Sequence, residues 1–383
     1  MIERIRTASC DDPKGSRASS PAASGTEPIS TDINATAERR PRWSVIVITR
    51  DEERHIEVCL NSIFAAFAGV PPEVILVDSA STDRTVDLAR RFPIRILSLP
   101  QGPHLSPALG RYFGMREAHG DFLLFLDGDC VLQQKWVGAA ERALDADDGL
   151  AGIAGASYGS LPVQADGSRP QVDEYPLADY DNPPFLAGSA AYKRSVLEKV
   201  GGFHPMLASG EEEELGARIR KGGFRMRRLR VQMTQHHPPH RKETPKELLR
   251  RLRRGYFVGL GQLARMAWSL DLPIERPFAD ISRHVLYFFW MLLGLCTAAA
   301  AGGTGFDLAA LAWAITTVLA VAAFAIRSGS LRKPAYYLLE WTLASPAVVY
   351  GLIKRPLPHD HRLPGIQPRL IARPGTAAGE HSG

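Results

Sequence analysis

The chain has 383 residues, with 46 lysines and arginines against 41 aspartates and glutamates. Hydrophobic residues make up 45% and charged residues 23%, which is ordinary for folded protein and excludes wholesale disorder. A net charge of +5 over this length gives no sign of a nucleic-acid partner, and four widely spaced cysteines argue against a disulfide scaffold or a structural zinc site.

Residues 1–40 are rich in serine, alanine, proline, threonine and arginine, with almost no large apolar side chains. Such a segment buries too little surface to offset the entropy lost on ordering, so we expect a disordered tail. The first residues also lack the apolar core of a secretory signal. We therefore expect the bulk of the chain to stay in the cytoplasm.

Short apolar runs alternate with helical patterns from residue 41 to about residue 240. The runs at 44–48, 74–77, 94–97 and 122–126 are those of strands buried on both faces. Alternation of strands and helices predicts parallel strands joined by right-handed crossovers, hence an α/β domain. Ligands of such domains lie beyond the carboxyl ends of the strands.

Two carboxylates follow the last of these runs, at Asp127 and Asp129. At the end of a buried strand, both side chains can turn toward the ligand crevice and hold a hard divalent cation. Mg²⁺ or Mn²⁺ bound in this way keeps open positions for substrate phosphates. The pattern therefore indicates a divalent cation site.

The chain from 281 to 355 has a different character. The runs at 284–303 and 306–326 are long and apolar enough to cross a bilayer as helices. A third stretch, 335–353, is interrupted by Glu340 and Pro346, and we expect it to be interfacial or re-entrant. The tail at 356–383 is expected to be flexible.

Basic residues flank these apolar runs. A basic amphipathic segment, 241–280, precedes the first run, and further cations follow the second, whereas the short link between the runs has none. The positive-inside rule then predicts that the α/β domain lies on the cytoplasmic side of the inner membrane, with a multi-pass anchor in the lipid bilayer. The cations are Arg250, Arg251, Arg253, Arg254, Arg327, Arg332 and Lys333.

Four segments occur in an order that resembles one enzyme family. They are VIVITRDEE at 45–53, VILVDSASTDRT at 74–85, an arginine-bearing helix at 106–120 that leads to the DxD pair, and GGF followed by EEEEL within 201–215. Together they resemble the motifs of family 2 glycosyltransferases. The resemblance implies a GT-A fold, a Rossmann-like sheet with flanking helices, and a membrane-associated, inverting enzyme that uses a nucleotide-sugar donor.

The resemblance also implies roles for single residues. Asp78 would accept a hydrogen bond from the nucleobase, Glu52 would face the nucleoside, and Thr49 and Arg50 would border the base. Arg111 lies at the position of the motif arginine. Asp83 is better explained as a residue at a helix start than as a ligand contact.

A cation held by Asp129, with Asp127 nearby, would neutralise the charge that grows on the leaving phosphate. In some relatives a histidine after the acidic motif completes the metal shell, and His236 is the candidate here. Pyrophosphate or anionic lipid headgroups would bind Arg250, Arg251, Arg253 and Arg254. Alternatively, these arginines are only interfacial anchors beside a membrane span.

An inverting transfer needs a carboxylate that removes the proton of the acceptor hydroxyl. The family places an aspartate there, second in an acidic pair, and the matching residue is Glu212. This longer side chain leaves the base open between Glu211 and Glu212, whereas Glu213 is better explained as a solvated residue at a helix start. Two further departures from the family pattern are Asp51 and Tyr112, both at positions where asparagine is usual.

The leading prediction is transfer of a sugar from a nucleotide-diphosphate donor to a lipid-linked or polysaccharide acceptor at the membrane. A nucleotidyltransferase of related fold is the enzymatic alternative. Such an enzyme would need a glycine-rich phosphate-binding loop after the first strand, and residues 49–53 contain no glycine. A non-catalytic membrane scaffold that retains the fold is the third alternative.

Overall fold

The structure, a computed structural model, describes residues 41–102, 105–160, 171–175, 179–236, 244–270, 272–273, 277–300, 308–354 and 366–374. The predicted disordered segment, 1–40, lies outside the described residues, as does most of the predicted flexible tail at 356–383.

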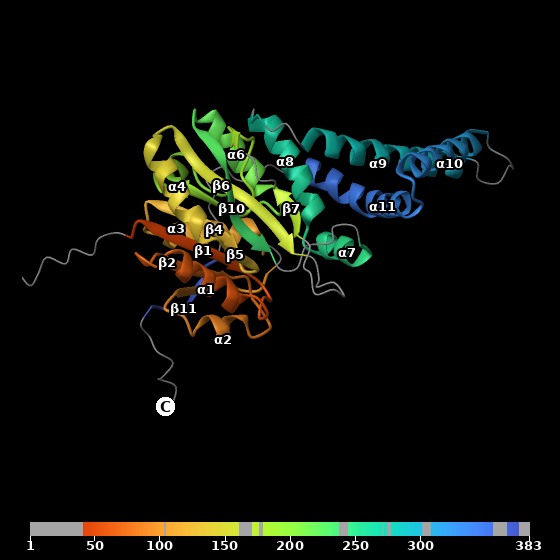
Figure 1. Ribbon diagram of the computed structural model, residues 1–383. Coiled ribbons are helices and arrows are strands. Elements are labelled where there is room, and N and C mark those ends of the chain that lie inside the picture. The colour runs from red at the N-terminus through yellow and green to blue at the C-terminus, as the bar shows by residue number, and fades with distance from the viewer. Residues whose placement is uncertain are drawn as a thin grey trace, which may run out of the picture. The chain divides into compact units, whose positions relative to one another are not determined.

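The described residues contain an α/β domain built on one mixed sheet (Figure 1). Its strands are β1 (Trp43–Thr49), β2 (Glu73–Asp78), β3 (Arg95–Ser98), β4 (Phe122–Asp127), β5 (Cys130–Leu132), β6 (Leu150–Ser160), β7 (Gln171–Tyr175), β8 (Tyr180–Asp181), β9 (Ala190–Lys193), β10 (Arg225–His236) and β11 (Arg369–Ala372). They follow the order β11-β3-β2-β1-β4-β9-β6-β10-β5, with β7 paired to β6 and β8 to β10.

The helices separate into those that cover the sheet and a C-terminal group. They are α1 (Ile56–Ala66), α2 (Thr85–Ala89), α3 (Pro107–Glu117), α4 (Gln134–Ala146), α5 (Arg194–Val200), α6 (Glu211–Lys221), α7 (Pro245–Arg253), α8 (Tyr256–Leu270), α9 (Pro277–Ala300), α10 (Leu308–Ser328) and α11 (Arg332–Ile353). Local chemistry explains the starts of two of them. Ser106 accepts a hydrogen bond from the Leu109 amide before α3, Thr244 accepts one from the Glu247 amide before α7, and proline follows each cap.

The four strands predicted from the sequence are β1 to β4, and they run parallel. Their register aligns the functional ends of the strands, since Thr49 lies opposite Asp78 on β2 and Ile48 lies opposite Asp127 on β4. The carboxyl ends of three neighbouring strands therefore meet at one edge of the sheet, as the ligand site of an open α/β sheet requires.

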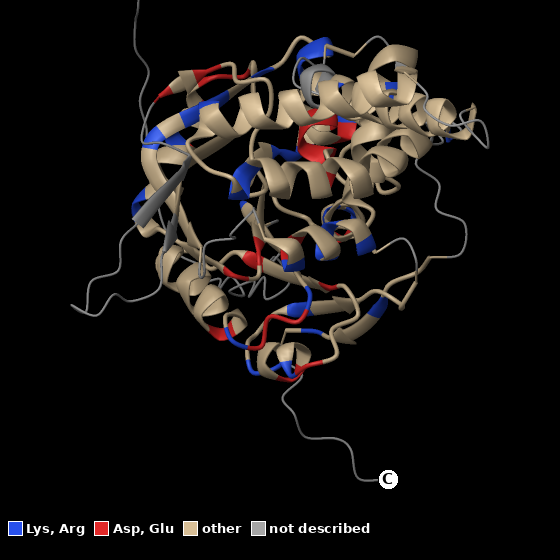
Figure 2. Cartoon of the chain, turned by 90° about the vertical axis from the view of Figure 1, so that its right-hand side faces the viewer, with Lys and Arg blue, Asp and Glu red and all other residues tan. Residues whose placement is uncertain are grey.

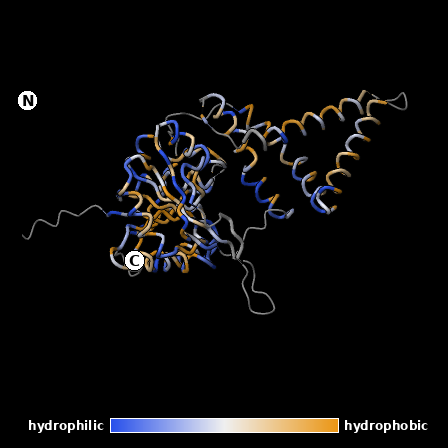
Figure 3. The backbone as a smooth tube through the Cα atoms, turned by 45° about the horizontal axis from the view of Figure 1, so that its top comes forward, coloured by the Kyte–Doolittle hydropathy of each residue, from blue (hydrophilic) through white to orange (hydrophobic). Residues whose placement is uncertain are grey.

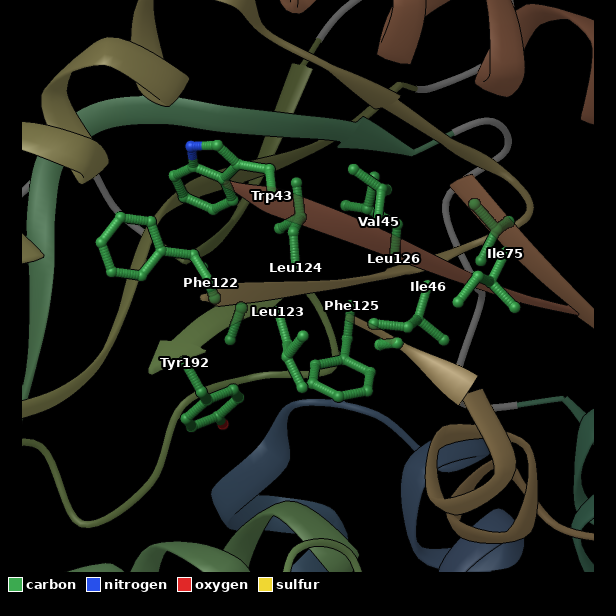
Figure 4. Close-up of a cluster of buried hydrophobic side chains, with 14 of the residues drawn as sticks. Trp43, Val45, Ile46, Ile75, Phe122, Leu123, Leu124, Phe125, Leu126 and Tyr192 are labelled. Carbon is green, nitrogen blue, oxygen red and sulfur yellow. The ribbon is translucent and has the colours of Figure 1, made fainter. Parts of the chain in front are cut away.

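Large apolar side chains of β1 and β4 fill the core on both faces of the sheet (Figure 4). Phe125 is 1% exposed and makes edge-to-face contacts with the rings of Tyr192 and Phe203. Trp43 contacts Phe122 at the other end of the same strands. Truncating a buried aromatic of this kind costs about 3–5 kcal/mol of unfolding free energy, so this core holds the strand ends in fixed positions.

The second half of the sheet brings together residues that are distant in sequence. Strand β5 directly follows the Asp127–Asp129 turn and pairs antiparallel with the end of β10. The register places Cys130 opposite His236. The imidazole of residue 236 thereby comes beside the second carboxylate of the DxD pair.

Helices α9 and α10 have the length and composition of membrane helices. The segments Ile281–Ala300 and Leu308–Ser328 are the two within the described residues that are apolar enough to cross a bilayer. Hydrophobic colour runs along most of both helices in Figure 3, and many of their large side chains face outward, such as Leu295 and Leu319. The predicted spans, 284–303 and 306–326, match these helices where the residues are described.

The predicted third segment, 335–353, lies within the single helix α11, which contains Pro346. Its second half packs closely on α8. A side chain at Gly261 or Gly351 would overlap the backbone of the facing helix, so small residues permit this close approach. Helix α11 therefore packs on α8, which lies within the predicted basic segment, 241–280.

The C-terminal tail needs one correction. We expected 356–383 to be flexible throughout, but Arg369–Ala372 form β11 and pair antiparallel with β3. Ile366 and Ile371 pack against the core beside this edge. The short apolar run Leu370–Ile371 lies within this strand, and the mostly polar composition of the tail around it gave no indication of a strand.

Candidate active site

A cavity of about 500 Å³ opens at the carboxyl edge of β1 and β4. Residues from the loop after β1, the DxD turn, the start of α6, and helices α7 and α8 form its wall. The predicted residues in this wall are Thr49, Arg50, Glu52, Arg111, Asp127, Asp129, Glu211, Glu212 and Arg254. Glu213, expected to be solvated, also lines the cavity.

The loop after β1 is tied to the loop after β2 through Asp51. This residue has a positive φ of 57°, a conformation that aspartate and asparagine tolerate better than most residues. Its carboxylate accepts hydrogen bonds from the Thr82 amide and hydroxyl, and its own amide donates to the Ser81 hydroxyl. Aspartate can therefore replace the usual asparagine here without loss of the loop geometry.

Asp83 holds the same pair of loops together. Its carboxylate accepts hydrogen bonds from the amides of Thr85, the first residue of α2, and Glu53. Burial alone would raise the pKa of Asp83, but these hydrogen bonds outweigh it and lower the pKa. The prediction of a helix-start residue is confirmed.

Asp78, at the end of β2, is almost fully buried. Its carboxylate accepts hydrogen bonds from the Ser81 amide and the Ser98 hydroxyl. Burial raises its pKa, and the hydrogen bonds offset part of that shift. Asp78 is not among the residues that line the cavity, so nucleobase contact stays a prediction.

A group with metal-ligand geometry lies where β5 meets β10. Ligand atoms of Asp129, Cys130 and His236 all lie within 4.8 Å of one another. A carboxylate and an imidazole together suit Mn²⁺, whereas a thiolate suits softer metals. Asp129 and His236, both predicted as ligands, are thus brought together, and Cys130 is a neighbour that sequence reasoning missed. Asp127 lies instead beside Arg111.

Arg111 of α3 links the DxD turn to the acidic start of α6. Its side chain is 3% exposed, and its guanidinium lies 3.2 Å from an Asp127 oxygen and 3.1 Å from a Glu212 oxygen. It also donates to Glu211. Burial alone would lower the pKa of Arg111, but the three carboxylates reverse this and raise it. Arg111 therefore stays charged and holds the two acidic segments at a fixed separation.

The two candidate bases occupy different environments. Gly210, with a φ of 79°, precedes α6. The first turn of this helix consists of four glutamates, and Asp and Glu residues are red in Figure 2. The side chain of Glu211 is 5% exposed, whereas that of Glu212 is 22% exposed. Burial and then the charge of Glu212 raise the pKa of Glu211 to about 8. Glu212 is therefore the carboxylate with access to a substrate.

The shifted pKa of Glu211 predicts a pH-dependent stability. The folded-state value of about 8 lies above the ordinary 4.5, so the contribution is complete below pH 4.5 and is lost as the pH rises through 8. Relative to Glu211→Gln, the wild type should lose unfolding free energy on the order of 1 kcal/mol per pH unit across this window. Thermal denaturation from pH 5 to 9 measures the difference.

The exposed Glu198→Gln serves as the control for this comparison and should track the wild type at every pH. A difference between wild type and Glu211→Gln that stays constant from pH 5 to 9 would show that Glu211 titrates normally.

Gly188 is a site residue that sequence reasoning missed. Its carbonyl oxygen lies 3.5 Å from the Arg111 guanidinium. A Cβ at this position would lie 2.8 Å from that guanidinium and 3.3 Å from an Asp127 oxygen. Only a residue without a side chain lets this backbone approach the charged cluster. Gly188 lies between Pro184 and β9, and no sequence motif there indicates a functional residue.

Gly188→Ala should therefore displace Arg111 and weaken catalysis. We expect a loss of about 1–3 kcal/mol of unfolding free energy from overpacking, and at least a tenfold fall in transfer rate from the shifted carboxylates. Gly69→Ala is the matched control, because a Cβ there meets nothing within 4 Å. Wild-type rates for Gly188→Ala would contradict the close approach.

The arginines before the membrane helices need a correction. Arg250, Arg251 and Arg254 line the cavity, whereas Arg253, predicted to bind substrate, is not among the residues that line it. Helical spacing explains this, because positions 250, 251 and 254 share one face of a helix and position 253 lies off it. Sequence reasoning also missed Glu247, whose carboxylate accepts hydrogen bonds from Arg250 and Arg251.

Comparison with known proteins supports the same interpretation. Residues 44–201 match the family profile described as Glycosyl transferase family 2. Glycosyltransferase AglE of Haloferax volcanii is 25% identical over 269 residues, 66% of this chain and 81% of that protein. A dolichol-phosphate mannosyltransferase of Pyrococcus furiosus is 32% identical over 90 residues, 22% of this chain and 25% of that protein.

Among solved structures, the mannosyltransferase PcManGT from Pyrobaculum calidifontis in complex with GDP-Man and Mn²⁺ is 23% identical. The match covers 82% of this chain and 87% of that chain, with a TM-score of 0.49. The family profile spans the parallel strands, their acidic ends and the DxD turn. Residues 44–201, which hold the parallel strands and the DxD turn, therefore match glycosyltransferase family 2, and the fold around them is of the α/β type that the family resemblance predicted.

Proposed function

We propose that this glycosyltransferase moves a sugar from a nucleotide-diphosphate donor to a lipid-linked or glycan acceptor, with inversion at the anomeric carbon. One observation carries the proposal: Asp129 and Glu212 line the same cavity at the carboxyl edge of the sheet. A cation ligand for the leaving phosphates and a base for the attacking hydroxyl thereby face one space.

Asp129 and His236 would hold the cation, Mn²⁺ or Mg²⁺, with Asp127 between it and Arg111. The carboxylate and imidazole donors fit this role. When bound, the cation would neutralise the negative charge that develops on the β-phosphate of the departing nucleoside diphosphate. Cys130, whose thiol lies beside Asp129, packs against these ligands.

Glu212 acts as the general base in this proposal. The acceptor oxygen bonds to the anomeric carbon as the bond from that carbon to the β-phosphate oxygen breaks, and the hydroxyl proton passes to Glu212. Attack from the face opposite the leaving group inverts the anomeric centre. Arg111, whose guanidinium lies 3.1 Å from a Glu212 oxygen, orients this carboxylate.

The nucleoside occupies the end of the cavity bordered by the loop after β1. Thr49, Arg50 and Glu52 line this end. The carboxylate of Glu52 lies within hydrogen-bond distance, 3.0 Å, of the His55 imidazole. Asp78, whose carboxylate accepts a hydrogen bond from the Ser81 amide, would contact the nucleobase in this proposal.

Helices α9 and α10 anchor the enzyme as a multi-pass protein of the inner membrane, with the α/β domain on the cytoplasmic side. Their apolar length and the cations before α9 and after α10 support this orientation. Helix α11 returns along the interface toward α8, on which it packs. The name of the dolichol-phosphate mannosyltransferase relative supports a lipid-linked acceptor.

A panel of UDP- and GDP-sugars tests the proposal on the full chain in detergent with Mn²⁺. A true donor at 100 times its dissociation constant should add about 2.7 kcal/mol of stability and raise the melting temperature. The same donor should be hydrolysed slowly, with release of nucleoside diphosphate that EDTA suppresses. If no nucleotide sugar shifts the melting temperature, the proposed donor class is wrong.

A further inference from the structure

The C-terminal strand lies beside the strand that supports Asp78. Strand β11 pairs antiparallel with β3, and Figure 1 shows it in blue among elements coloured red and orange. The register places Arg369 opposite Ser98, and Ser98 opposite Asp78 on β2. Asp78 in turn lies opposite Thr49, which lines the cavity. One row of paired residues therefore crosses four strands, from the C-terminal segment to the cavity.

Ser98 is the member of this row that contacts the Asp78 carboxylate from β3. Its hydroxyl donates a hydrogen bond to Oδ2 of Asp78 at 3.3 Å. The next residue, Leu99, donates its amide to the Asp78 carbonyl oxygen at 2.8 Å. The end of β3 thus holds both the side chain and the backbone of Asp78.

The loop after β2 supplies a second contact to this carboxylate. The Ser81 amide lies 3.3 Å from Oδ1 and 3.1 Å from Oδ2 of Asp78. A carboxylate has about four acceptor positions, so capacity remains for an N–H group of a nucleobase. Burial raises the pKa of Asp78, and the hydrogen bonds from Ser81 and Ser98 offset part of that rise. Ser98 therefore favours the ionised carboxylate, the form that only accepts hydrogen bonds.

Strand β3 depends on its neighbours because it is short. It has four residues, Arg95–Ser98, and Ser98 is the last of them. A short strand at an open edge frays readily, since its backbone groups are bonded on one side only. Strand β11 pairs with the second side, and Ile371 packs against the core beside it. The C-terminal strand thereby restricts the movement of Ser98.

We propose that β11 and Ser98 position the Asp78 carboxylate for the base of the nucleotide donor, so that the C-terminal segment is a functional part of the donor site. This inference rests on the proposed function, in which Asp78 contacts the nucleobase. Ser98 acts through Asp78 and is a positioning residue. The proposed cation ligands Asp129 and His236 lie toward the other end of the strand order, so the diphosphate end of the donor should not depend on this support.

Binding measurements on the full chain in detergent with Mn²⁺ separate the two ends of the donor. The probes are UDP, GDP and inorganic pyrophosphate. Ser98→Ala should weaken binding of the nucleoside diphosphate that wild type binds at least fivefold, as expected for the loss of a hydrogen bond to a charged group. It should change pyrophosphate affinity less than twofold. Ser98→Thr retains the hydroxyl and should keep nucleotide affinity within twofold of wild type.

Two variants test the contribution of β11. Leu370→Pro removes a backbone donor from the strand and should cause the same selective loss of nucleotide affinity. Ile371→Ala keeps the backbone intact, removes a contact with the core and should cause a loss of at least twofold, so the test holds even if Leu370→Pro does not fold. Gln367→Pro, at an exposed position before the strand, is the matched control and should leave both affinities unchanged.

Three results would overturn the proposal. Wild-type nucleotide affinity in Ser98→Ala would show that Ser98 does not position Asp78. Equal losses of nucleotide and pyrophosphate affinity would indicate a general loss of structure instead of a displaced carboxylate. Wild-type nucleotide affinity in every folded variant of β11 would remove that strand from the donor site.

Failure of the proposed function has a different signature, because wild type would then bind neither UDP nor GDP with Mn²⁺. Amide hydrogen exchange still tests the support in that case. Leu370→Pro and Ile371→Ala should both speed exchange at the Leu99 amide, which donates to the Asp78 carbonyl. Unchanged exchange at Leu99 would show that β11 does not hold the end of β3.

Discussion

Glu212→Gln should lower the transfer rate by about 10²- to 10⁴-fold, the usual contribution of general base catalysis. Glutamine keeps the size of the side chain and an oxygen that can accept from Arg111, whose guanidinium lies 3.1 Å from the present carboxylate. It cannot take up a proton from the acceptor hydroxyl. Steady-state transfer kinetics and donor titration by calorimetry should show a reduced kcat with donor affinity within twofold of wild type.

Two variants make this result specific. Glu212→Asp restores the aspartate that the family resemblance places here and should keep activity within about tenfold of wild type, because a carboxylate remains. Glu211→Gln should retain most of the transfer rate, since Glu211 is buried against Arg111. A large loss of kcat in Glu211→Gln with normal rates in Glu212→Gln would exchange the two roles. Donor affinity lost in step with the rate would make Glu212 a binding residue.

Asp129→Asn should lower the transfer rate by about 10²- to 10⁴-fold, because a cation at this site would contribute several kcal/mol of charge stabilisation in the transition state. The amide removes one negative charge from the group that contains His236. Titration of Mn²⁺ in the presence of UDP or GDP, followed by electron paramagnetic resonance, should show at least a tenfold weaker metal affinity.

The control lies at the other end of the same strand. Asp121, just before β4, is exposed, and Asp121→Asn should leave metal affinity and transfer unchanged. A second measurement tests whether the variant is folded: the melting temperature of Asp129→Asn without metal should stay near that of wild type. Unchanged Mn²⁺ affinity in a folded Asp129→Asn protein would rule out the proposed cation site.

The two departures from the family motifs have structural explanations. Asp51 adopts the positive φ that asparagine would also tolerate, and it ties two loops through Thr82. Tyr112 is buried in α3, where its hydroxyl accepts a hydrogen bond from Arg116, away from the cavity lining. Neither substitution removes a group that the proposed reaction requires, which weakens the case for a non-catalytic scaffold.

The sequence by itself determined the elements and the chemistry at their ends. Hydrophobic runs located β1 to β4, because burial on both faces demands continuous apolar strands. Parallel crossover connections then implied that Thr49, Asp78 and Asp127 end at one edge, which the register confirms. The two long apolar helices also followed from composition alone.

Only the tertiary structure decided which distant residues meet. Pairing of β5 with β10 brings Asp129 to His236, and the burial of Arg111 joins Asp127 to the start of α6. Gly188 and β11 were missed for the same reason: their roles come from close backbone approach and from pairing across the whole chain length, and neither leaves a local pattern. Local patterns report the free energy of burying a segment, whereas a site depends on contacts that exist only after the segments have packed.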